Sequence, residues 1–188
     1  MSQDADGVVK ESDEAVYLLE VGLQPSEYGP PVYTLLLMEE DARNGKDRPL
    51  TDEDGYIVWF SEPGDAERAL ALGDEGFRRY APPPTEVAAS YDFARMFWMV
   101  NDEPRETGNS TIEALNLLLD LVEATAFTFP PEYRRTLFAL ADHLTFSLNI
   151  GEHLTDTAAR DRAMDAITWC IGAVAIKSRM LPRRDAGT

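Results

Sequence analysis

Two hydrophobic runs, AVYLLEV at residues 15–21 and VYTLLLM at residues 32–38, indicate the fold class of this chain. Both are rich in the aromatic and branched residues that favour strands, and glycines and prolines between residues 22 and 31 separate them. The two runs are therefore predicted to form neighbouring strands. A third strand, YIVWF at residues 56–60, is predicted after a charged connection.

The sheet region is predicted to continue to about residue 81. Asp65 is expected to cap a short helix over residues 66–72, with Gly73 following its last turn. Residues 77–80 are predicted to form a last short strand. The prolines at residues 82–84 then mark a boundary, because each proline fixes φ and removes a hydrogen-bond donor.

Beyond these prolines the apolar residues recur at helical spacing, which predicts four helices. The first covers residues 85–100, and the second begins at Ser110, whose spacing to Glu113 fits a capping box. The third begins at Pro130-Pro131, and the fourth covers residues 156–180. The fourth is apolar nearly all round over residues 166–176, as expected of a helix in the middle of a bundle.

Together these patterns predict an α+β fold: a small, mainly antiparallel sheet of about three or four strands with one short helix, then a four-helix, bundle-like portion. A β-rich subdomain is expected over residues 15–81 and a helical subdomain over residues 85–181. The two can share one core, because so small a sheet has few ways to bury a face alone. Residues 1–14, which are acidic, and residues 182–188 are expected to be disordered tails.

Negative charge is concentrated in the N-terminal part of the chain. Of the formal net charge of −17, residues 1–75 contribute 19 acidic and 5 basic side chains. This charge disfavours direct binding to nucleic acids or to anionic membranes. The longest charge-free runs have eleven residues, which is too short to cross a bilayer. The single cysteine and the acidic N-terminus favour a cytoplasmic location.

The sequence lacks the common catalytic motifs. Its twelve glycines form neither a dinucleotide-binding nor a P-loop pattern, and it has no nucleophile elbow. Cys170 is expected to be a buried packing residue. An EF-hand loop centred on Gly55 fails, because its first and twelfth positions would be Leu50 and Ser61. We therefore predict no cofactor and no metal site.

The two histidines leave one catalytic alternative open, a small metal-dependent hydrolase. Its residues would be Asp142, His143, Glu152 and His153, which are suitable ligand types for transition metals. Each acid is adjacent in sequence to its histidine, so on a helix the two would lie about 100° apart and diverge. A structural subunit of a homo-oligomer, associating through apolar helix faces, is a further alternative.

The favoured interpretation is a non-catalytic interaction protein, such as a bacterial-style adaptor, inhibitor or immunity partner, whose acidic N-terminal surface binds a basic protein partner. The connection over residues 39–55 is long for a compact domain, and such connections are usually either functional or disordered. A purely solvated connection is the alternative. Tyr28 and Tyr80 lie beside prolines and are candidate aromatic anchors. The candidate interaction residues are Glu39, Glu40, Asp41, Asp47, Asp52, Glu53, Asp54, Tyr28 and Tyr80, with Glu62, Asp65, Glu67, Asp74 and Glu75 extending the same acidic surface.

Overall fold

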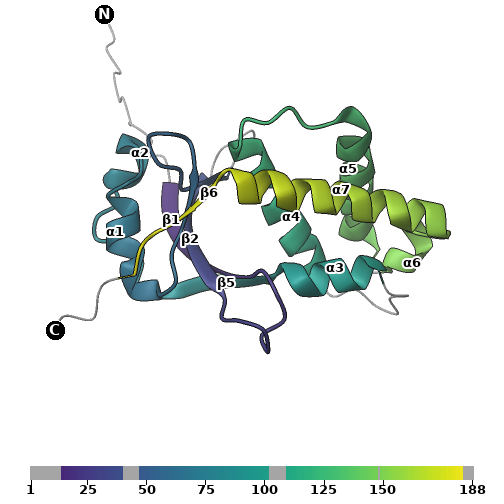
Figure 1. The fold of residues 1–188 in the computed structure, drawn as a ribbon, viewed down its shortest axis with the longest axis horizontal. Helices are drawn as coiled ribbons and strands as arrows, with labels where there is room; N and C mark the ends of the chain where they lie inside the picture. The colour runs from purple at the N-terminus through teal and green to yellow at the C-terminus, as the bar shows by residue number, and fades with distance from the viewer. Residues whose placement is uncertain (1–13, 40–46, 102–108, 148, 184–188) are drawn as a thin grey trace, which may run out of the picture.

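The computed structural model describes residues 14–39, 47–101, 109–147 and 149–183. A four-stranded sheet lies between the helical half of the chain and two short helices (Figure 1). Its strands are β1 (Glu14–Gly22), β2 (Val32–Glu39), β3 (Arg48–Pro49) and β5 (Val87–Asp92), in the order β3-β2-β1-β5. β1 and β2 form an antiparallel pair, β3 lies antiparallel to β2, and β5 lies parallel to β1.

The two central strands bury side chains on both faces of the sheet. Leu19 of β1 and Leu36 of β2 belong to a core cluster that the helical half completes. Leu18 of β1 and Leu35 of β2 belong to a second cluster on the opposite face. Successive side chains of a strand point to opposite faces, so strands that are apolar at consecutive positions require cover on both sides.

Two short helices cover the second face, and a small second sheet lies beside β2 and contributes side chains to both core clusters. A 3-10 turn at Pro63–Asp65 leads into α1 (Ala66–Leu70), which is followed by α2 (Glu75–Arg78). β4 (Ile57–Trp59) pairs in parallel with β6 (Ser178–Met180), which comes from the C-terminal end of the chain. The N–H of Tyr33 in β2 donates to the carbonyl of Phe60 at 2.8 Å, which links the small sheet to the large one.

The helical half supplies the first core cluster. It contains α3 (Phe93–Asn101), α4 (Asn109–Ala124), α5 (Pro131–Phe146), α6 (Ile150–His153) and α7 (Thr157–Ile176), and α7 packs against α3, α4 and α5. Asp156 caps α7 by accepting the N–H of Ala159 at 2.7 Å. None of the helices that the structure describes has the length and apolar character needed to span a membrane.

The predicted α+β class is confirmed: a mostly antiparallel sheet is combined with several helices. Both sheets combine strands from the two sides of the triple proline at residues 82–84, since β5 joins the large sheet and β6 joins the small one. Residues 1–13 and 184–188 of the two predicted tails lie outside the described residues, whereas Glu14 belongs to β1.

Four local predictions are wrong. Asp65 precedes α1 but makes no capping hydrogen bond with its side chain, which pairs with Arg68 at 2.8 Å instead. Residues 87–92 form β5 instead of a helix, because the open side of β1 offers backbone hydrogen bonds that override a weak helical spacing. Residues 77–80 do not form a strand, since Asp74 accepts the N–H of Phe77 at 3.1 Å and caps α2. The last long helix ends at Ile176, and residues 178–180 pair with β4.

The two-sided burial of β2 predicts matched losses of stability. Leu35 and Leu36 point to opposite faces and are 0% and 3% exposed. Replacing either with alanine is expected to lower the free energy of unfolding by about 2–5 kcal/mol, because each change opens a cavity in a separate core. Val87→Ala at the exposed edge is the control and should cost less than about 1 kcal/mol. Urea unfolding followed by circular dichroism measures all three, and a small effect at either leucine would show that its face is not packed.

Candidate interaction surface

The predicted acidic loop ends in a tight turn that Asp52 organises. Asp52 Oδ1 accepts the backbone N–H of Asp54 at 3.0 Å and that of Tyr56 at 2.9 Å. The N–H of Gly55 donates to the carbonyl of Asp52 at 2.9 Å, and Gly55 has a φ of 75°, which glycine adopts without a Cβ clash. Aspartate followed by glycine is a typical turn sequence for this reason.

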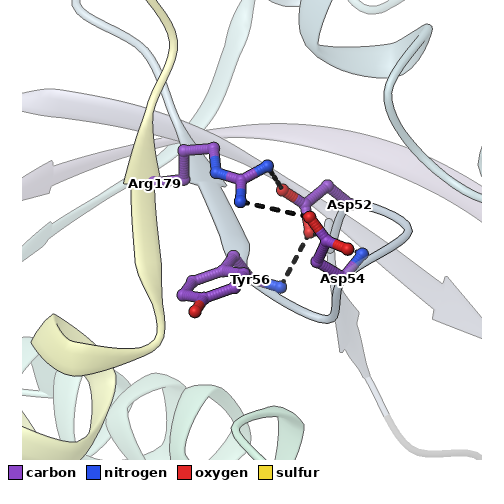
Figure 2. A network of polar contacts seen from close by, with 4 residues as sticks. All are labelled: Asp52, Asp54, Tyr56 and Arg179. Atoms are coloured by element: carbon purple, nitrogen blue, oxygen red, sulfur yellow. Dashed lines mark hydrogen bonds and ion pairs between the residues drawn. The ribbon is translucent and has the colours of Figure 1, made fainter.

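Arg179 of β6 binds this turn from the other end of the chain (Figure 2). Its guanidinium lies 2.6 Å from Asp52 Oδ2 and 3.2 Å from Asp54 Oδ2. The Asp52 side chain is only 7% exposed, and its Oδ2 makes this ion pair without an aligned hydrogen bond. The Arg179 guanidinium and the Lys177 ammonium each lie 4.8 Å from the centre of the Tyr56 ring. The network therefore anchors the C-terminal strand to the turn.

Two further acids of the predicted surface are also engaged within the chain. Glu53 pairs with Arg78 at 3.2 Å, and Asp74 pairs with Arg48 at 3.2 Å. Asp47 is half-buried, and burial raises the pKa of its carboxyl group. Glu40 and Asp41 lie outside the described residues, as does the side chain of Glu39.

The two candidate tyrosines have different environments. Tyr28 is 74% exposed and closes a turn by donating its N–H to the carbonyl of Pro25 at 2.9 Å. Tyr80 packs partly against the second core cluster, and the Arg79 guanidinium lies 5.2 Å from its ring centre. Tyr28 is thus available to a partner, whereas Tyr80 contributes mainly to packing.

An open apolar groove lies on the N-terminal half, between α1, α2 and the extended segment that leads to β5. Its volume is about 990 Å³, and its apolar lining includes Leu70, Pro82 and Pro83. Glu67 and Arg78 supply the charges of the lining. The sequence interpretation treats the prolines as a boundary and therefore misses this groove. The combination of rigid prolines with the short apolar helix over residues 66–72 is the signal that points to it.

Three exposed acids that have no ion-pair partner among the described residues belong to the segments that border this groove, and one of them, Glu67, lines it. Glu67 of α1, Glu75 of α2 and Glu86 before β5 are exposed and make no such pair, and we call them the groove acids. The arginines nearest to them in sequence are Arg68, which is paired with Asp65, Arg78, which is paired with Glu53, and Arg79, which lies over the Tyr80 ring. The groove acids therefore contribute an uncompensated negative field beside an apolar surface.

The structure brings the two histidines together, whereas the acids next to them in sequence point elsewhere. The ring centres of His143 and His153 are 5.1 Å apart, and His143 Nε2 lies 3.0 Å from the carbonyl of Asn149. Glu152 instead accepts hydrogen bonds from Ser147 Oγ and Asn149 Nδ2, and Asp142 is exposed. Within the described parts of the chain, no group of three or more histidine, cysteine, aspartate or glutamate side chains is placed to hold a metal ion.

Cys170 is fully buried in α7, as the sequence predicts. Burial raises the pKa of its thiol to about 12, so the thiol stays protonated at neutral pH. A protonated thiol inside the helical core is a packing group, because the thiolate is the reactive form.

Comparison with known proteins bears on the fold. No protein-family model matches the chain, and no curated protein matches it in sequence. The structure is similar to the crystal structure of the SatS C-terminal domain in complex with bromine, with a TM-score of 0.51 over 88% of this chain and 94% of that chain. The two sequences are 16% identical, so this likeness concerns the fold alone.

The network at Arg179 predicts a difference between two neighbouring aspartates. Arg179→Met leaves the nearly buried Asp52 carboxylate uncompensated and is expected to lower the free energy of unfolding by about 1–3 kcal/mol. Asp54→Asn removes an exposed pair, and thermal unfolding should show a change within about 0.5 kcal/mol. Equal effects of the two substitutions would contradict a structural role for the Asp52 pair.

The histidine pair predicts a loss of stability in mild acid. Burial, and then the neighbouring His143, lower the pKa of His153 below its ordinary value of 6.5. Below pH 6.5 the unfolded chain takes up a proton before the folded chain does, so the free energy of unfolding falls until the pH passes the lowered pKa. His153→Asn should reduce this decline in urea unfolding between about pH 7.5 and about pH 5.5. An unchanged decline in the variant would show that His153 does not cause it.

Proposed function

We propose that this chain is a non-catalytic interaction protein that binds a basic protein partner through the acidic surface of its N-terminal half. The observation that carries the proposal is an open apolar groove that Glu67 lines, with Glu75 and Glu86 in its bordering segments. All three acids are exposed and have no ion-pair partner among the described residues. An exposed apolar groove supplies affinity, and uncompensated charge beside it selects a partner of opposite sign.

The pairing of the other acids supports this placement of the binding surface. Asp52, Glu53 and Asp54 already interact with arginines of the same chain, and Asp52 also holds its own turn. A partner would have to replace those internal contacts, whereas the groove acids require no such exchange. Tyr28, which is exposed, remains a candidate contact on the same half of the chain.

We propose a non-catalytic role because the thiol and the imidazole groups that the structure describes are not arranged for catalysis. The buried thiol of Cys170 stays protonated, and the His143–His153 pair has no carboxylate placed with it to complete a metal site within the described residues. The single cysteine is compatible with a reducing compartment, so the proposal includes a cytoplasmic location.

The test is a triple variant of the groove acids, Glu67→Gln, Glu75→Gln and Glu86→Gln. The matched control neutralises exposed acids of the helical half, Glu132→Gln, Asp161→Asn and Asp165→Asn, and changes the net charge equally. Each immobilised protein is exposed to native cell lysate at about 50 mM and about 300 mM salt, and retained proteins are quantified by mass spectrometry. We expect the original chain and the control to retain the same basic proteins at low salt, and the groove variant to lose most of them.

Two results would contradict the proposal. Equal loss in the control variant would show that total charge, and not the groove, governs retention. Retention that is unaffected by salt and by the groove substitutions would remove the electrostatic argument altogether.

A further inference from the structure

The two edges of the large sheet differ in how they are protected. At one edge, β3 has two residues, and they are an arginine and a proline. Short strands, proline and charged side chains are the usual means by which proteins block an edge against another strand. At the other edge, β5 has six residues without lysine, arginine or proline, and Asp92 at its end carries the one charge in the strand.

β5 is also open to solvent. Among the strands that the structure describes, it pairs with β1 alone. Val87 is 38% exposed, and Ala88 and Ser90 are exposed as well. The outer side of this strand therefore presents backbone N–H and carbonyl groups beside small side chains, which is the arrangement that an extended peptide can join by hydrogen bonding.

Hollows lie at both ends of this edge. The apolar groove, which Thr85 helps to line, lies just before β5 in the chain. A second hollow of about 270 Å³ lies between the β1–β2 connection and residues 90–92, and Glu20, Ser90 and Asp92 line it. Glu20 and Ser90 are neighbours across β1 and β5, so they project from the same face of the sheet. If a further strand were added beside β5, every second side chain of that strand would point to the face of the sheet on which Glu20 and Ser90 lie, toward these hollows.

Charge at the two ends favours a basic occupant. Glu67 and Glu86 lie at the start of the edge, and Glu20 and Asp92 lie at its end. Arg78, which also lines the first groove, is paired with Glu53. A second copy of the chain is a poor occupant, because each copy has a formal net charge of −17.

We infer that an extended segment of a partner protein, with alternating basic and apolar side chains, binds by adding a strand to the outer edge of β5. This inference rests on the proposed function and specifies how the acidic surface engages its partner. Main-chain hydrogen bonds to β5 would hold the segment, while the groove takes an apolar side chain and the acids at both ends take basic ones.

The probe is an acetylated and amidated peptide of about eight residues in which lysine and valine alternate. Its controls are a block peptide, with all lysines before all valines, and an alternating peptide methylated on every amide nitrogen, which keeps the charges but cannot donate to β5. Each peptide is titrated into the isotope-labelled full chain, and amide signals are followed by NMR at low salt. We expect the alternating peptide to shift and protect amides of residues 87–92, and both controls to bind at least about tenfold more weakly.

Two protein variants complete the test. Ala88→Lys places a positive charge on the exposed edge and should weaken binding of the alternating peptide at least about tenfold. Ala158→Lys, at an exposed position near the start of α7, should not. Circular dichroism confirms that both variants fold. Three results would each overturn strand addition. They are equal binding of the methylated peptide, unchanged binding of the alternating peptide to Ala88→Lys, and no binding of the alternating peptide at about 1 mM.

The outcomes separate the two proposals. If lysate proteins still depend on the groove acids while Ala88→Lys has no effect, the acidic surface binds its partner by another mode, and only strand addition fails. If the groove variant retains every lysate protein, the proposed function itself fails. Light scattering tests whether the chain itself is the partner. Dimers that form in the original chain and are lost in Ala88→Lys would show that β5 binds a second copy, and would overturn the assignment of a different protein as partner.

Discussion

The central constraint on this molecule is that β1 and β2 are apolar at consecutive positions, so both faces of their sheet must be covered. Leu19 and Leu36 pack on the helical half, whereas Leu18 and Leu35 pack in the second cluster with residues of α1, α2 and β4. Such strands are normally found in the middle of layered folds. The order of elements follows from this constraint, because one part of the chain covers each face.

The second core cluster also takes in the C-terminal end of the described chain, because Leu181, directly after β6, belongs to it. β6 completes the small sheet beside β4, and Arg179 fixes β6 to the Asp52 turn. Acids that look available in the sequence are therefore used to hold the fold. The groove acids remain exposed in and next to the segments that line an apolar groove, and for this reason our proposal puts the binding surface there.

The fold class could be predicted because it depends on local patterns. Each of these patterns indicates its element without reference to distant residues. They are the apolar runs at residues 15–21 and 32–38, the proline at the start of α5 and the aspartate before α7. Residues 87–92 could not be assigned correctly, since their strand exists only through pairing with β1. Similarly, β6 depends on β4, which lies more than a hundred residues earlier.

The candidate surface was less predictable for the same reason. Asp52 and Arg179 are 127 residues apart, and nothing local indicates that their charges meet at 2.6 Å. The sequence identifies an acidic half but cannot separate acids that are paired from acids that are free. The contact between His143 and His153 depends likewise on how α6 folds back on α5.

Native-state amide hydrogen exchange of the free chain tests most directly the claim of a doubly covered sheet with one open edge. Amides of β1 and β2 that bond within the sheet should exchange only through global unfolding, because both faces are packed. Alternate amides of β5 point outward and should exchange orders of magnitude faster. Uniform protection along β5, equal to that of β1, would contradict the account by showing that this edge is already covered.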